Sequence, residues 1–255
     1  MSGLTRRLRA RRDEGGFTLI ELLVSILLLS VLGGVFMSTV LGSNRSATAS
    51  KLQHDINEDA RLAINRMARE LRQATAITAV RNADGPGYSA TAITAVTFSA
   101  DFDGDGCING VAPTPLPSPA PTCNAANLAS NPEVLTYCYD PALPSASATG
   151  QKLLLIPGTL SVPGCNQPGA LPILAANVTS FALSYRSNLY LYDTNGDGVT
   201  SWTELDQAAP PVGDSDDNIN TGELPKVDSV LISVALLEGG HQQSYRTQVA
   251  LRNVS

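Results

Sequence analysis

The first long feature of the chain is an apolar run that contains a single charge. Residues 17–41 read FTLIELLVSILLLSVLGGVFMSTVL, and Glu21 is the only charged side chain among them. As an α-helix with a rise of ~1.5 Å per residue, this run would be about 37 Å long, enough to cross a hydrocarbon core of ~30 Å. The pattern predicts a helix that spans a membrane.

Residues 44–75 keep a helical spacing but add polar faces. Apolar side chains recur at every third or fourth position, as in an amphipathic helix that packs against a core. Together with the apolar run, they predict one long helix that is apolar all round at first and amphipathic afterwards. The apolar positions of the second part are Leu52, Ile56, Ala60, Ala63, Met67 and Leu71.

After residue 76, short β-type runs alternate with turn residues. Strands that follow a single helix, without helix–strand alternation, predict an antiparallel α+β domain with long loops. The last two runs are separated by a short turn at 238–243, which predicts a hairpin. The runs are 77–80, 92–99, 134–139, 152–156, 178–185, 227–237 and 244–253.

Residues 111–122, VAPTPLPSPAPT, interrupt this pattern with five prolines at alternate positions. Proline lacks the N–H group that a central strand needs, so these residues predict an extended, polyproline-like surface loop. Such a loop is either a stiff insert or a recognition motif.

Charge is distributed unevenly between the two ends of the chain. The whole sequence has 17 Lys and Arg against 23 Asp and Glu, a net charge of −6. Residues 1–16 carry five arginines and two acidic side chains, whereas residues 75–255 carry six basic and sixteen acidic side chains. A basic cluster before an apolar span places that end in the cytoplasm and the acidic remainder outside. The acidic remainder argues against non-specific DNA binding, which needs clustered Lys and Arg.

Two ordinary interpretations of the amino terminus leave features unexplained. A secretory signal has an apolar stretch of about 7–15 residues and a small-residue cleavage site, and this run is longer and has no such site behind it. A plain membrane anchor does not explain Glu21, because a carboxylate inside a span costs a few kcal/mol. Nor does it explain Gly15 and Gly16 directly before the span.

The string GGFTLIELLV at residues 15–24 resembles the signal of type IV prepilins and type II secretion pseudopilins. The resemblance implies that prepilin peptidase cuts between Gly16 and Phe17, and that Phe17 becomes the N-methylated first residue. Glu21 would then be the fifth residue of the processed chain. Pairing Glu21 with the Phe17 amine of a neighbouring subunit would neutralise two charges that are costly in hydrocarbon.

The resemblance also implies a type IV pilin-like fold of the α+β class, with the long helix packed on an antiparallel sheet. Its parts would be a leader peptide (1–16), a transmembrane or filament-core helix (17–43) and a globular domain (44–255). The globular domain would contain an amphipathic helix (44–75) and a β-rich part (76–255). The segment NRMARELRQ at 65–73 resembles the helix end of minor pilins of the PilW or PulJ kind. Gly33 and Gly34 would give this helix either a flexible point or a place for close packing.

Four cysteines lie after the apolar run, and an even number in an exported region predicts two disulfides. Three pairings are possible. We favour Cys107 with Cys123, which would clasp the proline-rich loop, and Cys138 with Cys165, which would tie a strand to a nearby loop.

Residues 193–204 fit the calcium-loop pattern D-x-[DN]-x-[DN]-G-x₅-E at every position. They resemble EF-hand and dockerin loops, although the preceding residues 188–192 look like a strand and not like an entering helix. The alternative is a turn rich in Asp, Asn and Gly. Calcium binds six to eight oxygens, and those expected here belong to Asp193, Asn195, Asp197, the carbonyl of Val199, Ser201 and a bidentate Glu204.

Two further acidic segments are weaker candidates for calcium. The pattern begins again at residue 101, but its twelfth position is Ala112, so this loop needs a carboxylate from elsewhere. Residues 214–220 are a still looser match. The expected ligand positions of the loop at 101 are Asp101, Asp103, Asp105, Cys107 and Asn109.

The function expected from these features is that of a minor pilin or pseudopilin. The subunit would wait in the cytoplasmic membrane and then join a type IV pilus or a type II secretion pseudopilus, in assembly initiation or at the tip. Its partners would be prepilin peptidase, other pilins and the assembly platform in that membrane. The alternatives are a calcium-dependent surface adhesin and a DNA-uptake pilin. An enzyme is not expected, because the chain has only two histidines and no GxSxG, HExxH or phosphate-loop motif.

Overall fold

A computed structural model describes the chain from residue 16 to residue 251, with gaps. The described residues are 16, 18–83, 85, 88–108, 111–112, 119–123, 132–144, 151–160, 164–188, 190–220, 222–238 and 240–251. Gly15, Phe17, Asn109 and residues 113–118 of the proline-rich stretch lie outside them. The chain divides into two units, residues 1–52 and residues 53–255, and each is described by itself.

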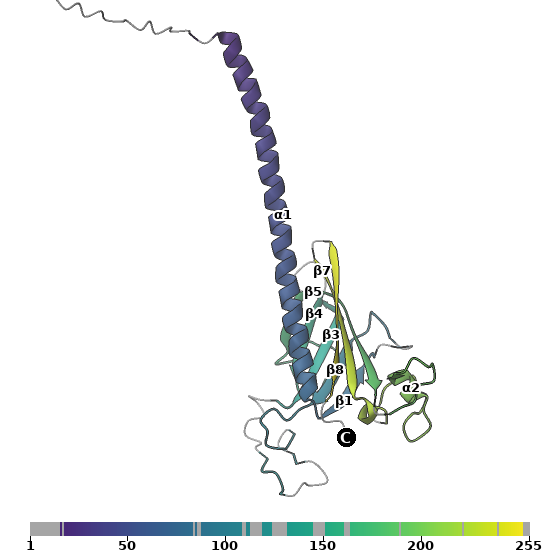
Figure 1. Ribbon diagram of the computed structural model, residues 1–255. Helices are drawn as coiled ribbons and strands as arrows, with labels where there is room; N and C mark the ends of the chain where they lie inside the picture. Colours follow the sequence, from purple (N-terminus) through teal and green to yellow (C-terminus); the bar gives the residue numbers. More distant parts are fainter. Residues whose placement is uncertain are drawn as a thin grey trace, which may run out of the picture. The chain divides into compact units, whose positions relative to one another are not determined.

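One helix, α1 (Leu19–Gln73), crosses the boundary between the units (Figure 1). Thr18 starts it, because its side-chain oxygen accepts a hydrogen bond from the N–H of Glu21 at 3.3 Å. In the first unit every described side chain of the helix is exposed, including the large apolar ones from Leu19 to Leu41. The helix is long and apolar enough to cross a membrane, and its most apolar stretch is not buried by the rest of the chain.

In the second unit, the helix buries the apolar stripe that the sequence indicates. Ala60, Met67 and Leu71 are fully buried, Ala63 is nearly so, and Ile56 is partly buried. The stripe belongs to one core that the helix shares with the sheet. The structure therefore confirms the α+β arrangement of a long helix packed on an antiparallel sheet.

The described residues of the second unit form one antiparallel sheet with the strand order β1-β2-β3-β4-β5-β7-β8, and β6 pairs with β5 at one end. Consecutive strands are neighbours except where the short β6 intervenes, so the sheet is a meander. Its strands are β1 (Ala76–Arg81), β2 (Thr94–Ser99), β3 (Val134–Pro144), β4 (Gln151–Pro157), β5 (Leu171–Ser187), β6 (Thr200–Ser201), β7 (Ser229–Glu238) and β8 (His241–Ala250).

The core between helix and sheet is rich in aromatic side chains. The rings of Phe98 and Tyr137 stack with centroids 5.6 Å apart. The Tyr137 hydroxyl donates a hydrogen bond to Glu70 on the helix, and Glu70 also accepts one from Arg66 at 2.9 Å. Burial raises the pKa of Tyr137, and the negative charge of Glu70 raises it further, so this hydroxyl stays protonated and holds the helix to β3.

The observed strands differ from the predicted ones mainly at their ends. Strand β5 begins at Leu171, well before the predicted residue 178, and the last strand runs from His241 to Ala250. The β7–β8 turn is tighter than expected, since Glu238 pairs with His241 and Gly240 adopts a φ of 82° that favours glycine. Helix α2 (Trp202–Asp206) and the 3₁₀ turn η2 (Leu224–Lys226) are too short to show a periodic pattern in the sequence.

Candidate metal sites and the amino-terminal motif

The loop at 193–204 joins β5 to α2 and is wound around the side chain of Asp193. One Asp193 oxygen, Oδ1, accepts the N–H of Gly196 at 2.7 Å, and the other accepts the N–H of Gly198 at 2.7 Å. Both glycines have φ values near +80°, a conformation that costs other residues more. The backbone of this loop therefore favours glycine at position 198, the glycine of the pattern, and also at position 196, which the pattern leaves open.

The next two side chains of the pattern repeat the arrangement. Asn195 Oδ1 accepts the N–H of Asp197 at 2.8 Å, and Asp197 Oδ1 accepts the N–H of Val199 at 2.8 Å. All three pattern side chains at 193, 195 and 197 are exposed. Each of these side chains accepts a hydrogen bond from an N–H two or more positions later in the chain, and these bonds stabilise a compact turn.

Glu204 ties the end of this loop to its beginning. Its Oε1 accepts hydrogen bonds from the N–H and the hydroxyl of Thr194, both at 2.9 Å, and from the N–H of Asn195 at 3.2 Å. Its Oε2 accepts the N–H of Ser201 at 2.9 Å, as in a helix capping box. Burial alone would raise the pKa of Glu204, but the hydrogen bonds from Ser201 and Thr194 outweigh it and lower the pKa to about 2.

Because the pKa of Glu204 is lowered in the folded domain, the stability of the domain should depend on pH. A carboxylate with a folded pKa of about 2 and an ordinary pKa of 4.5 stabilises the fold above pH 4.5. In a calcium chelator, the contribution of Glu204 to the free energy of unfolding should fall by up to about 3 kcal/mol between pH 5 and pH 2. Urea unfolding across this range should show a weaker dependence for Glu204→Gln than for Glu58→Gln, an exposed control. Equal pH slopes in the two variants would contradict the assignment.

The loop at residue 101 folds in the same way as the loop at residue 193. Asp101 accepts the N–H groups of Gly104 at 2.6 Å and Gly106 at 2.9 Å, and both glycines again have positive φ. Asp103 accepts the N–H of Asp105 at 3.1 Å, and Asp105 accepts that of the next odd residue, 107, at 2.8 Å. Position for position, the first seven residues of the two loops share this hydrogen-bond pattern.

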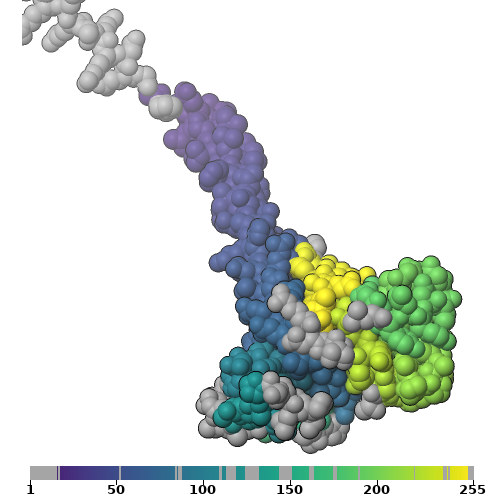
Figure 2. Space-filling model, turned by 60° about the horizontal axis from the view of Figure 1, so that its bottom comes forward, coloured from purple at the N-terminus to yellow at the C-terminus, as the bar shows by residue number. Residues whose placement is uncertain are grey.

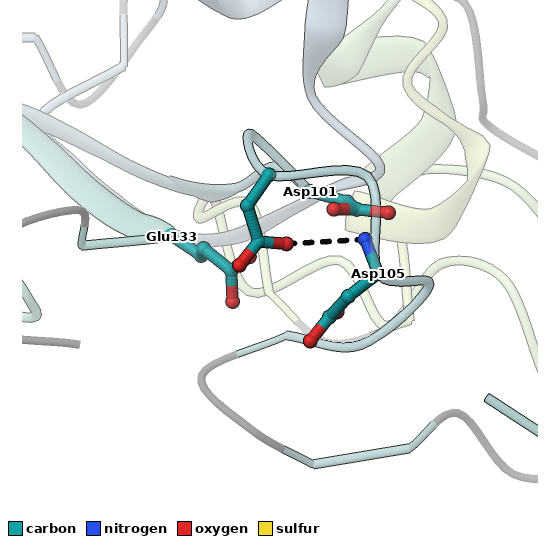
Figure 3. A group of neighbouring side chains, drawn as sticks. Asp101, Asp105 and Glu133 are labelled. Atoms are coloured by element: carbon teal, nitrogen blue, oxygen red, sulfur yellow. Dashed lines mark hydrogen bonds between the residues drawn. The ribbon is translucent and has the colours of Figure 1, made fainter. Parts of the chain in front are cut away.

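Glu133 supplies the carboxylate that the pattern at residue 101 lacks. Carboxylate oxygens of Asp101, Asp103, Asp105 and Glu133 all lie within 4.8 Å of one another, and Glu133 is only 4% exposed. Figure 3 shows Glu133 entering this group from a separate segment of the chain. The segment is held there because the N–H of Ala100 donates to the carbonyl of Glu133 at 2.8 Å, directly beyond the β2–β3 pairing.

No local pattern in the sequence points to Glu133, although Ala112 at the twelfth position predicts that this loop needs a carboxylate from elsewhere in the chain. A second group joins Asp206, which is buried, to Asp214 and Asp216 of the loosest acidic segment. These are the two groups of close acidic oxygens among the described residues, and neither includes Glu204. The loop with the better sequence pattern is thus the one whose carboxylates lie further apart.

Two disulfides are formed, with the pairing that the sequence analysis favours. Cys107 bonds to Cys123 across the proline-rich segment, and Cys138 on β3 bonds to Cys165 in the β4–β5 connection. Cys107 is also the seventh residue of the acidic loop. Because its sulfur is in the disulfide, only the backbone carbonyl of Cys107 could bind an ion in this loop. The second disulfide packs with Ala95, Leu154 and Ile156 in a small cluster apart from the main core.

At the amino terminus, the structure describes Gly16, Thr18 and the helix that follows. Glu21 lies in the first turns of α1 and is exposed among exposed apolar side chains. Residues 11–37 match the family model of the prokaryotic N-terminal methylation motif. No curated protein and no solved structure matches the chain. The matched segment contains both glycines before the span, Phe17 and Glu21.

Proposed function

Because the chain is a type IV pilin-like protein with a prepilin-type motif, we propose that it is a minor pilin or pseudopilin. The motif implies processing by prepilin peptidase and assembly with other pilins. The subunit joins a type IV pilus or a type II secretion pseudopilus and acts in assembly initiation or at the tip. The match at residues 11–37 is the observation that carries this proposal.

Before assembly, the subunit lies in the cytoplasmic membrane with its amino terminus inside and its β-rich domain outside. The exposed apolar side chains of α1 support the membrane location, and the arginines of the leader support the orientation. The same apolar surface becomes the contact with neighbouring helices in the filament. The minor role is supported by the resemblance of residues 65–73 to minor pilins and by the large domain with long loops.

We propose that two loops of the domain bind calcium, as bracing elements and not as catalytic groups. At the first loop the ligands are Asp193, Asn195, Asp197, the carbonyl of Val199, Ser201 and Glu204. To bind the ion, Glu204 gives up hydrogen bonds that it accepts from Thr194 and Ser201. At the second loop they are Asp101, Asp103, Asp105 and Glu133. The support is the shared hydrogen-bond pattern of the loops and the buried carboxylate of Glu133. Carboxylate oxygens are the ligands that calcium prefers, and the ion would offset their mutual repulsion.

A second candidate function is calcium-dependent adhesion at the filament tip. Asp193, Asn195 and Asp197 are exposed, so an ion held by them would remain accessible to a ligand. Binding of the processed protein to a surface that is lost in chelator and restored by calcium would favour adhesion over a purely structural role.

Processing at Gly16 tests the main proposal. In a host with prepilin peptidase, mass spectrometry of the protein should show a chain that begins with N-methylated Phe17. Gly16→Glu should keep the leader, because the residue before the cut is altered. Gly42→Ala is the matched control, since an added Cβ at this helical position meets nothing within 4 Å, and it should be processed normally. If the unaltered protein keeps its leader in such a host, the proposal that this chain is a pilin or pseudopilin is wrong.

A further inference from the structure

The segment that follows α2 folds back onto the end of that helix. Gly213 allows the close approach, because a Cβ at this position would lie 2.2 Å from the carbonyl oxygen of Asp206. The buried Asp206 side chain accepts the N–H of Asp216 at 3.0 Å with Oδ1 and the N–H of Asp217 at 3.2 Å with Oδ2. These bonds hold the end of α2 against residues 214–217.

Three carboxylates meet where the segment touches α2, and we call them the 206–216 group. They belong to Asp206, Asp214 and Asp216, and one oxygen of each lies within 4.8 Å of an oxygen of the other two. Asp214 and Asp216 are exposed, and Figure 2 shows this part of the chain, in green to yellow-green, at the surface of the domain. An ion can therefore reach the group from solvent. Without an ion, carboxylates this close repel one another.

A fourth acidic side chain, connected to this group by one residue, has an oxygen without a partner. Glu223 is fully buried, and its Oε2 accepts the N–H of Asn220 at 2.9 Å. The side-chain amide of Asn220 donates in turn to Asp214 at 2.8 Å. Oε1 of Glu223 is buried and has no hydrogen-bond partner among the residues that the structure describes. A buried carboxylate oxygen without a donor is costly unless a positive charge satisfies it.

Glu223 has the same local geometry in its segment as Glu204 in the loop at 193. Each glutamate accepts, through Oε2 and at 2.9 Å, the N–H of the residue three positions before it. In the loop at 193, the other oxygen of Glu204 accepts N–H groups at the start of the loop. The corresponding N–H groups, those of residues 215–217, are bound by Asp206 instead. The start of this segment thus has no N–H left for Oε1 of Glu223.

We propose that the 206–216 group and Glu223 bind a third calcium ion. The three aspartates supply carboxylate oxygens, and Glu223 supplies Oε1 directly or through one water molecule. Every side chain in this set is an oxygen donor, which suits calcium and not the metals that prefer nitrogen or sulfur. Since α2 carries both Glu204 and Asp206, this ion would stabilise the same helix that closes the loop at 193. The site does not rest on the proposed filament role.

Counting the calcium ions bound by the full-length protein in detergent tests this site. The double variant Asp214→Asn/Asp216→Asn keeps the shape of both side chains and removes two charges from the group. In equilibrium dialysis it should bind one ion fewer than the parent, or hold one ion with an affinity lower by about tenfold or more. Asp217→Asn is the matched control, because Asp217 is exposed in the same segment but lies outside the group. It should bind as many ions as the parent.

Glu223→Gln distinguishes a ligand from a structural residue. Glutamine can still accept the N–H of Asn220, so a purely structural role predicts unchanged calcium binding. A ligand role predicts that the affinity for one ion falls by about tenfold or more. In chelator, the melting temperature of this variant should equal or exceed that of the parent, because the substitution removes a buried charge that has no partner on one oxygen.

An equal number of ions in the parent and the double variant would overturn the proposal. So would an equal loss in Asp217→Asn, since net charge and not the group would then control binding, or unchanged calcium affinity in Glu223→Gln. Circular dichroism in chelator should show the parent's β-sheet signal in every variant. If the double variant has lost this signal, the single variant Asp216→Asn takes its place.

The same measurement separates this site from the two loops proposed above. If Glu204→Ala and Glu133→Gln each lose an ion but the double variant does not, only the third site is refuted. If the double variant alone loses an ion, the third site stands and the proposal for the loops at 101 and 193 fails.

Discussion

Calcium should raise the melting temperature of residues 44–255 by roughly 6–15 °C. An ion that binds only the folded state adds about 3–4 kcal/mol when it is present at 100–1,000 times its Kd. For a domain of this size, each kcal/mol corresponds to about 2–4 °C. The physical reason is that an ion would neutralise the close carboxylates of the loop at 101 and would bind the oxygens of the calcium-type loop at 193. The measurement is thermal unfolding in chelator and in millimolar calcium.

Two single variants assign this gain to its loops. Glu204→Ala should remove the part that comes from the loop at 193, and Glu133→Gln the part that comes from the loop at 101. Glu204→Ala also loses its hydrogen bonds to Thr194 and Ser201, so the comparison is always the same variant with and without calcium. Glu58→Ala, on the exposed helix face, should keep the full gain. If the unaltered domain melts alike in both solutions, the metal proposal fails.

Glu133 is the sharper of these two tests. It lies outside the loop at 101 in sequence and joins it only through the fold. A simple Asp- and Gly-rich turn would be indifferent to Glu133→Gln, because that turn is closed by its own hydrogen bonds. A lost calcium response in this variant would therefore distinguish a metal site from a turn.

The Met67→Ala substitution should lower the free energy of unfolding of the same fragment by about 2–5 kcal/mol. Met67 is fully buried where the helix meets the sheet. Its truncation removes buried apolar surface and leaves a cavity that a close-packed core fills only in part. Urea unfolding of the variant and the parent measures the difference.

Leu62→Ala is the matched control for Met67→Ala, because it truncates a large apolar side chain on the opposite, exposed face of the same helix. It should change the stability of the isolated fragment by no more than about 0.5 kcal/mol. Equal losses in the two variants would mean that the helix does not pack through the buried stripe.

The position and length of the long helix can be predicted from the sequence, because two hydrophobic patterns extend over many residues. The apolar run and the stripe from Ile56 to Leu71 each repeat over several turns, so no tertiary contact is needed to recognise them. Short elements behave differently. Helix α2 buries Trp202 and Leu205, but five residues cannot show a period. Strand β5 begins early at Leu171 because β4 is there to pair with it.

In the candidate sites too, residues placed by local hydrogen bonds can be predicted from the sequence, whereas residues placed by contacts between distant segments cannot. The Asp and Gly positions of both loops could be read directly, because each oxygen meets an N–H only a few residues ahead. Glu133 and Asp206 could not, because they reach acidic groups through the arrangement of distant segments. For Glu133, the position follows from the β2–β3 register, in which Ser99 pairs with Val134.

Formation of the Cys107–Cys123 disulfide depends on which side of the membrane the domain is on. Cys107 closes the disulfide and is also the seventh residue of the acidic loop. Thiols stay reduced in the cytoplasm and are oxidised outside. If the domain is exported with the orientation proposed above, this disulfide would form outside the cytoplasm, on the same loop that we propose binds calcium. Under that proposal Cys107 would connect disulfide formation with calcium binding, and the loop would reach its final structure only after export.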